Sequence, residues 1–336
     1  MIFSAGPAKQ NQQVLDHMAE LIKRKPSILE VSHRSQEFQT LLNDTKQTLR
    51  KLLDVPDEME ILFLSGGASF QFQMIPANLL HKKAGYLLTG LFSRMAYEAG
   101  CAFGNCEVIY DNTNHPYELS DFPWKIKGDY DYVHLCLNNS LYGTRTPDVV
   151  CDCPLIADVS SILGIEKIDF SSYALCYASA QKNFGMSAMT LVFIRKDLRF
   201  KTGLIPLISY KDQMQADSLL NTPPVSAIVM CKLIAEELLK RKSSLYDENR
   251  KKAELFYEFL DHQIKYLPLV QTHRSMMNCS FQMKDNISEQ KFLEECEAHG
   301  IIGLKGHRQT GHLRASFSVH NTVEEVKTLI EFMKSR

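Results

Sequence analysis

Seven short apolar runs, separated by segments with helical spacing, restrict the fold of this 336-residue chain more than any other feature. The runs are nearly continuous in apolar residues, a pattern typical of strands buried on both faces. Because strands and helices alternate, the pattern predicts an α/β fold with a mostly parallel seven-stranded sheet. The runs cover 61–65, 85–90, 106–111, 131–137, 154–160, 175–180 and 190–195.

The pattern changes in the last third of the chain. Apolar runs at 278–283 and 312–319, each followed by a helical segment, predict a small α+β domain. Two domains also suit the length, since single cores stop growing at about 250–300 residues. We expect a large domain at 10–240 and a small domain at 241–336 that also includes segment 1–9. Helices are predicted at 10–25, 36–53, 70–80, 93–100, 223–262, near 288–299 and at 323–334.

Composition narrows the class of protein. With 38 Lys and Arg against 39 Asp and Glu, no basic excess favours nucleic acid or a membrane surface as a partner. No window reaches the roughly 20 apolar residues of a membrane span, and the start "MIFSAGPAKQ" lacks the features of a signal peptide. The nine cysteines are scattered without metal-ligand spacing, as in reduced cytosolic proteins. We therefore expect a cytoplasmic protein without a bound metal.

Lys182 follows one predicted buried strand, and Asp158 lies at the end of another. A lysine at such a position is partly desolvated, which lowers its pKa and makes the amine nucleophilic toward carbonyl compounds. An acid at the same edge of the sheet, where ligands bind in α/β folds, suits pyridoxal phosphate, because a carboxylate keeps the pyridine nitrogen protonated. Taken singly, Lys182 could instead extend to solvent and Asp158 could cap a helix.

The stretch "LSGGASFQF" at 64–72 predicts a strand, a Gly-Gly turn and the start of a helix. Free backbone N–H groups and the positive end of the helix dipole would bind a phosphate there. Such a turn alone is weak evidence, because most Gly-Gly pairs are only turns. Its place ahead of Asp158 and Lys182 favours a phosphate-binding role.

Seven motifs in order give the chain a full-length resemblance to the phosphoserine aminotransferases, class V members of the fold-type I pyridoxal-phosphate enzymes. An ordered set of motifs is far more specific than any one of them. The motifs are "FSAGPA" (3–8), "EVSHRSQEF" (30–38), "FLSGGASFQF" (63–72), "NNSLYGT" (138–144), "YASAQKNFG" (177–185), "NTPP" (221–224) and "GHRQTGHLRAS" (306–316).

The resemblance implies a role for each matching residue around the cofactor. Lys182 would bind the cofactor aldehyde as a Schiff base, and Asp158 would pair with the ring nitrogen. Ser140 would contact the ring oxygen, and Phe92 would stack on the ring. The phosphate would be held by Gln181, by the backbone of Ala68 and Ser69, and by Asn221 and Thr222 of the neighbouring subunit, which implies a homodimer with shared sites.

The basic residues of two motifs suggest how a doubly anionic substrate binds. Arginine's planar fork suits carboxylate and phosphate groups. By resemblance, Arg314 would bind the α-carboxylate of glutamate or 3-phosphohydroxypyruvate. The substrate phosphate would be surrounded by His33, Arg34, His307 and Arg308, some of them across the dimer interface. Either motif alone could be a solvated basic loop.

Four places depart from the family pattern. Phe92 stands where tryptophan is usual, and "NFGMSAM" (183–189) replaces the usual sequence after the lysine. The segment before "SHR" is short, and Gly311-His312 replaces a Gly-Gly pair before Arg314. These changes affect cofactor packing and loops rather than the charged groups.

The function implied is a phosphoserine aminotransferase of serine biosynthesis. It would exchange the amino group between glutamate and 3-phosphohydroxypyruvate to give O-phosphoserine and 2-oxoglutarate. Whether phosphohydroxythreonine of pyridoxine synthesis is also accepted stays open. Other class V enzymes share the frame, so an aminotransferase for an unphosphorylated keto acid and a cysteine desulfurase are alternatives. A catalytically degenerate homologue that only binds a ligand or a partner is a third.

Overall fold

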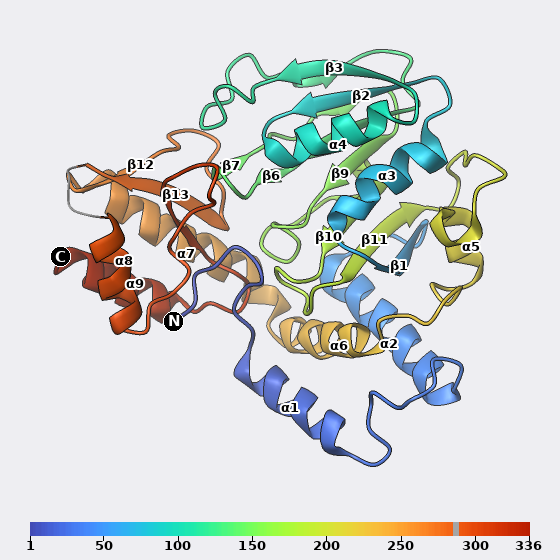
Figure 1. The fold of residues 1–336 in the computed structure, drawn as a ribbon, viewed down its shortest axis with the longest axis horizontal. Helices are drawn as coiled ribbons and strands as arrows, with labels where there is room; N and C mark the ends of the chain where they lie inside the picture. The colour runs from blue at the N-terminus through green and yellow to red at the C-terminus, as the bar shows by residue number, and fades with distance from the viewer. Residues whose placement is uncertain (285–288) are drawn as a thin grey trace.

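A seven-stranded sheet forms the centre of the larger part of the molecule (Figure 1). The computed structural model describes residues 1–284 and 289–336. The strand order is β1-β11-β10-β9-β5-β2-β3; β11 runs antiparallel to both neighbours, and the other pairs are parallel. The mostly parallel sheet predicted from the sequence is confirmed. The strands are β1 (Met59–Ser65), β2 (Lys83–Leu88), β3 (Asn105–Asp111), β5 (Tyr132–Cys136), β9 (Leu155–Asp158), β10 (Leu175–Ser179) and β11 (Met189–Arg195).

One strand differs from the expectation of burial on both faces. β3 lies at the edge of the sheet, and most of its side chains are exposed or half-buried. The apolar residues of 106–111 suggested a central strand, and that interpretation was wrong. β3 is last in the strand order and pairs with β2, and its residue Val108 is 37% exposed. Strand preferences depend on the packing against neighbours, which a local sequence does not contain, so the run alone did not separate an edge position from a central one.

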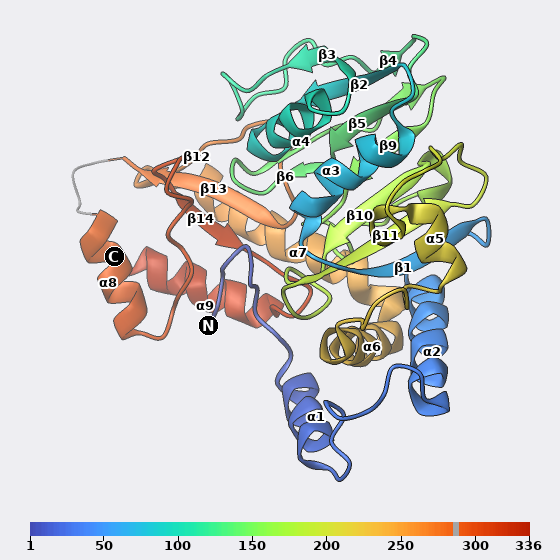
Figure 2. The same ribbon diagram turned by 45° about the vertical axis from the view of Figure 1, so that its right-hand side comes forward.

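Helices cover both faces of the sheet (Figures 1 and 2). One face packs against α2 (Gln36–Leu53) and α6 (Val225–Lys240), with α1 (Gln12–Lys23) against α6. The other packs against α3 (Ala68–Leu79), α4 (Leu91–Cys101) and the short α5 (Tyr210–Gln215). Alternate residues of each central strand therefore enter two separate apolar cores, which explains their near-continuous hydrophobicity.

The elements of the predicted small domain form a second layered unit with its own apolar core beside the end of this sheet. Its antiparallel sheet has the order β12-β13-β14. The Phe3 N–H donates to Ile302 O at 2.9 Å, and the Ser316 N–H donates to Phe3 O at 2.9 Å, so the first residues pack with this domain. The elements are α7 (Lys242–Asp261), β12 (Tyr266–Pro268), β13 (Asn278–Met283), α8 (Glu289–Ala298), β14 (Leu313–Ser316) and α9 (Val323–Lys334).

Local signals explain several helix ends. Ser35 Oγ accepts from the Phe38 N–H at 3.2 Å and starts α2 at the predicted residue. Thr322 and Glu325 form a capping box at the start of α9. The segment 223–262, predicted as one helical stretch, is broken at Arg241, which has non-helical backbone angles and separates α6 from α7. The expected start of α8 at 288 lies outside the described residues.

Short elements complete the architecture. The two-residue strands are β4 (Lys125–Ile126), β6 (Asn138–Asn139), β7 (Thr144–Arg145) and β8 (Val150–Cys151), and the 3-10 helices are η1 (Phe170–Ser172) and η2 (Pro206–Ile208). Within residues 1–284 and 289–336, every helix is too short or too polar to cross a membrane.

Candidate active site

Residues at or after the ends of five strands line one cavity at the carboxyl edge of the parallel sheet. The strands are β1, β2, β5, β9 and β10, and they contribute together because strands of the same direction end at the same edge. Seven of the predicted site residues meet there, although they are up to 114 positions apart between Ala68 and Lys182. The lining residues are Gly67, Ala68, Ser69, Phe72, Phe92, Cys136, Asn138, Ser140, Asp158, Ser160, Ser161, Ser179, Gln181 and Lys182.

Lys182 lies in the turn that follows β10. Burial lowers the pKa of its amine and the nearby Arg314 charge adds to this, while Asp158 acts in the opposite direction. Its Nζ is 5.8 Å from the centre of the Phe92 ring, so both occupy the same part of the cavity. A lower pKa leaves more of the amine unprotonated near neutral pH, and only the unprotonated amine is a nucleophile.

Asp158 is the last residue of β9 and is paired in register with Tyr177 and Cys136 on the neighbouring strands. Burial raises the pKa of its carboxyl, whereas Lys182 and hydrogen bonds from Ser160 and Tyr177 lower it. Its Oδ1 accepts from the Ser160 N–H at 2.8 Å. This local turn accounts for one carboxylate oxygen only, so the residue can also bind a cationic group in the cavity.

The start of α3 supplies backbone donors to the cavity. Gly67 caps this helix without any side-chain hydrogen bond, which leaves the first N–H groups free to bind a ligand. A Cβ atom at Gly67 would have no neighbour within 4 Å, so the space beside the turn is open. Ala68 and Ser69 line this part of the cavity together with Gln181. The geometry suits a phosphate group.

Arg314 reaches the cavity region from β14 of the small domain. Its Nη1 donates to Ser140 O at 2.5 Å, while its buried Nε has no hydrogen-bond partner among residues 1–284 and 289–336. Burial lowers the pKa of this guanidinium to about 10. A buried arginine N–H without an acceptor is costly, and an anionic ligand would satisfy it.

Several lining residues were missed by the sequence analysis. Asn138 binds Ser161 Oγ at 2.8 Å and Asn278 Oδ1 at 2.9 Å through its Nδ2, and its buried Oδ1 has no partner. Ser160, Ser161 and Ser179 surround Asp158 and Lys182. Part of their signal was present: the quoted motifs contain Asn138 and Ser179 but neither Ser160 nor Ser161, and small polar residues after strands are too common to single out.

The remaining predicted site residues lie outside the cavity of their own chain. Asn221 lines a different hollow with Gly66 and Phe70, and Thr222 is exposed beside it. His33 and Arg34 lie in the loop before α2, where Arg34 is exposed. Burial lowers the pKa of His307, and the charges of the nearby Arg314 and Arg308 lower this pKa further. A single chain therefore brings together the residues predicted to bind the cofactor ring and the substrate α-carboxylate. It brings together only some of those predicted to bind the cofactor phosphate and the substrate phosphate.

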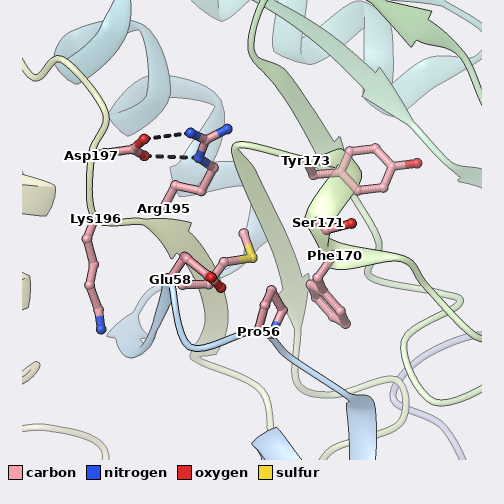
Figure 3. Close-up of a pocket in the computed structure, with 9 residues that line it drawn as sticks. Pro56, Glu58, Phe170, Ser171, Tyr173, Arg195, Lys196 and Asp197 are labelled. Atoms are coloured by element: carbon pink, nitrogen blue, oxygen red, sulfur yellow. Dashed lines mark hydrogen bonds and ion pairs between the residues drawn. The ribbon is translucent and has the colours of Figure 1, made fainter.

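A wider hollow lies at the opposite end of β1 and β11, as Figure 3 shows. It measures about 560 Å³ against about 140 Å³ for the cavity at Lys182. Arg195 there already binds Asp197 through two hydrogen bonds of 2.9 and 2.5 Å. Both of the hollow's cations are paired, since Lys196 Nζ also lies 3.9 Å from Glu60 Oε2. The hollow is at the end of the sheet opposite to Lys182 and Asp158, so its size does not make it the active site.

The cavity at Lys182 fits the predicted cofactor, pyridoxal phosphate. The Lys182 amine suits the aldehyde, Asp158 the ring nitrogen and the start of α3 the phosphate. The partnerless Asn138 Oδ1 offers a further acceptor. Within the described ranges, no cluster of three or more His, Cys, Asp or Glu is arranged to bind a metal ion.

Comparison with known proteins assigns the chain to a family. Residues 1–329 match the model of the class-V aminotransferases. The chain belongs to the class-V aminotransferase family. It is thus a pyridoxal-phosphate-dependent transaminase, and the fold and cofactor predicted from the sequence are confirmed.

Similarity to individual proteins gives more detail than the family match. The chain is 38% identical over 347 residues to the phosphoserine aminotransferase of Bacillus cereus, covering 99% of this chain and 96% of that protein. The phosphoserine aminotransferase structure from Bacillus circulans subsp. alkalophilus has a TM-score of 0.92 at 32% identity and 99% and 97% coverage. The pyridoxal-phosphate-bound structure from Trichomonas vaginalis has a TM-score of 0.91 at 32% identity and 99% coverage of both chains.

Proposed function

We propose that this protein is a phosphoserine aminotransferase. It transfers the amino group of glutamate to 3-phosphohydroxypyruvate and yields 2-oxoglutarate and O-phosphoserine, a step of serine biosynthesis. The observation that carries the proposal is the convergence of Lys182, Asp158 and the open start of α3 on one cavity, with the partnerless Arg314 Nε beside it. The full-length similarity to phosphoserine aminotransferases supports it.

Lys182 is the proton carrier of the proposed reaction. Pyridoxal phosphate, when bound, supplies an electron-accepting ring that stabilises negative charge at the substrate Cα. In the proposed reaction the Lys182 amine would remove the Cα proton of glutamate, and in the second half of the reaction it would return a proton to the Cα of the product. Its lowered pKa suits this role, because a base must be unprotonated near the working pH.

Asp158 and Arg314 position the reacting groups. Asp158 holds a proton on the ring nitrogen, and the Ser160 N–H at 2.8 Å fixes its carboxylate. Arg314 binds the α-carboxylate that both substrates share. Its bond to Ser140 O fixes one end of the guanidinium and leaves Nε for the ligand.

The phosphate of the second substrate would be bound by His307 and Arg308, together with His33 and Arg34. We predict that Arg308→Ala raises the KM for 3-phosphohydroxypyruvate by about 10- to 100-fold, because a charge-assisted contact is worth roughly 1.5–3 kcal/mol. The KM for glutamate should change less than about twofold. Steady-state kinetics with each substrate varied in turn checks this.

The same kinetics decide between substrate classes. The wild-type enzyme should strongly prefer the phosphorylated keto acid over pyruvate and glyoxylate. If an unphosphorylated keto acid is the better substrate, or if Arg308→Ala affects both substrates equally, the phosphate-binding assignment is wrong. A degenerate homologue would show no spectral change of the bound cofactor on addition of glutamate.

The proposed site needs a second copy of the chain, because Asn221 and Thr222 lie outside the cavity of their own subunit. We predict that Lys182→Ala and Thr222→Ala protomers, each inactive or weak, regain activity when mixed under conditions of subunit exchange. Random pairing gives hybrids with one intact site of two, so about a quarter of wild-type activity is expected from equal amounts. Activity assays after mixing measure this.

Absence of recovery in hybrids shown to form by native mass spectrometry would contradict shared sites. The homodimer, the cytoplasmic location and the lack of a nucleic-acid partner stay predictions from the sequence.

A further inference from the structure

We propose that His312 is a positioning residue, which holds Arg314 and the turn at Ser140–Leu141 in the geometry that binds the substrate α-carboxylate. The inference rests on the proposed function for the role of Arg314. His312 stands where the resembled family has glycine, so its side chain adds contacts that a glycine cannot make. These contacts join three segments that are distant in the sequence.

Both ring nitrogens of His312 have partners. Nε2 is 3.2 Å from Leu141 O, and Nδ1 is 2.9 Å from the Tyr117 hydroxyl. A carbonyl oxygen only accepts, so Nε2 carries the proton and Nδ1 accepts from the Tyr117 hydroxyl. The side chain is 5% exposed, and its burial together with the Arg314 charge lowers its pKa, which agrees with a neutral ring having one donor and one acceptor.

His312 and Arg314 act on neighbouring carbonyls. They are two residues apart where the chain enters β14, so their side chains leave the same face of the strand. Arg314 Nη1 donates to Ser140 O at 2.5 Å, and His312 Nε2 donates to Leu141 O. Ser140 lines the cofactor cavity. The small domain thus fixes the turn and the arginine relative to the cavity through two adjacent bonds.

Tyr117 ties the same histidine to the large domain on its other side. The Tyr117 ring packs edge-on against Tyr142 of the turn, with ring centres 5.6 Å apart. The preceding Pro116 O accepts from Thr144 Oγ1 at 3.2 Å. The loop at 116–117, the turn at 138–144 and β14 therefore meet at His312. An arginine held in place before the ligand arrives loses less conformational freedom on binding, which raises affinity.

The test compares His312→Gly, His312→Gln and Tyr117→Phe with a control, His262→Gln. His262 is an exposed histidine remote from the site in sequence, and its Nδ1 lies 2.8 Å from Glu258 O. Loss of two neutral hydrogen bonds and of preorganisation predicts a rise of about tenfold in the KM for glutamate and for 3-phosphohydroxypyruvate in His312→Gly. Both should rise because both substrates carry the α-carboxylate. The kcat should change less than about threefold, since Arg314 binds the ground and transition states alike.

The other two variants should raise the KM values less than His312→Gly does. Tyr117→Phe keeps the bond to Leu141 O and should raise both KM values about threefold. His312→Gln retains an N–H that reaches Leu141 O and should restore most of the affinity lost in His312→Gly. The control should match the wild type.

Calorimetry gives a readout without turnover. The holoenzyme in its aldehyde form cannot transaminate 2-oxoglutarate, yet it binds the α-carboxylate of this acid, and the Kd should weaken about tenfold in His312→Gly. If the wild type fails to use the phosphorylated keto acid, the proposed function is wrong, while this titration still tests His312. Unchanged Kd and KM values in a folded His312→Gly, or loss of cofactor absorbance with a large fall in kcat, would overturn the proposal.

Discussion

Replacing Lys182 with alanine is expected to abolish both the covalent attachment of the cofactor and nearly all turnover. The amine is the only group of the described cavity lining that can form a Schiff base, since the other lining residues carry no primary amine. Loss of this nucleophile and of the proton carrier predicts a fall in kcat of at least about 10³-fold, because general acid–base catalysis alone contributes roughly 10²–10⁴-fold. Steady-state kinetics and the visible spectrum of the holoenzyme measure the two effects.

Borohydride reduction makes the test specific to this residue. In the wild type it should fix the cofactor irreversibly, and mass spectrometry should locate the added mass on the peptide that contains Lys182. Lys182→Arg keeps a positive charge but should be as inactive as Lys182→Ala. The control Lys196→Ala, whose side chain is 55% exposed at the other end of the sheet, should behave as the wild type. Label on another lysine, or an active Lys182→Ala, would refute the assignment.

The sequence predicted the fold well because hydrophobic patterning and end signals agree along most of the chain. α2 begins at the predicted residue because Ser35 caps it, and β13 coincides with its apolar run. The prediction failed where the outcome depends on neighbours distant in the sequence. The run of β3 was interpreted as buried on both faces, yet its position at the sheet edge follows from strand order. β12 was not predicted, since three residues give no measurable period.

The candidate site was also predictable only where local sequence determines the position of a residue. Lys182 and Asp158 were predictable because each lies at or just after the end of a buried strand, and parallel strands end at one edge of the sheet. The roles of Asn138 and His312 were not predictable, because each depends on a partner in another segment, such as Asn278 for Asn138 and Tyr117 for His312. Hydrogen-bond pairing across domains leaves no periodic signal in a sequence.

The substitution Asp158→Asn should leave the cofactor attached to Lys182 while kcat falls by about 10²–10³-fold, the magnitude for removal of one charge-stabilising group from an active site. Asparagine has nearly the same shape but carries no negative charge, so it no longer favours a proton on the ring nitrogen. The Ser160 N–H, which now donates to Asp158 Oδ1, can donate to the amide oxygen instead, so the turn after β9 should persist. The spectrum of the holoenzyme and single-turnover rates with glutamate separate attachment from chemistry.

Asp158→Glu and Asp57→Asn are the matched variants for this prediction. Glutamate keeps the charge but places it one methylene further into the cavity, so activity between that of the wild type and Asp158→Asn is expected. Asp57, with a side chain 96% exposed, tests the loss of a carboxylate elsewhere and should have no effect. If Asp158→Asn retained full single-turnover rates, the carboxylate would have no electronic role, and its proximity to Lys182 would reflect only the tuning of the lysine pKa. In Asp158→Asn the pKa of Lys182 should fall further below its ordinary value. Burial lowers this pKa and the Asp158 charge raises it, so loss of the charge leaves the effect of burial less opposed.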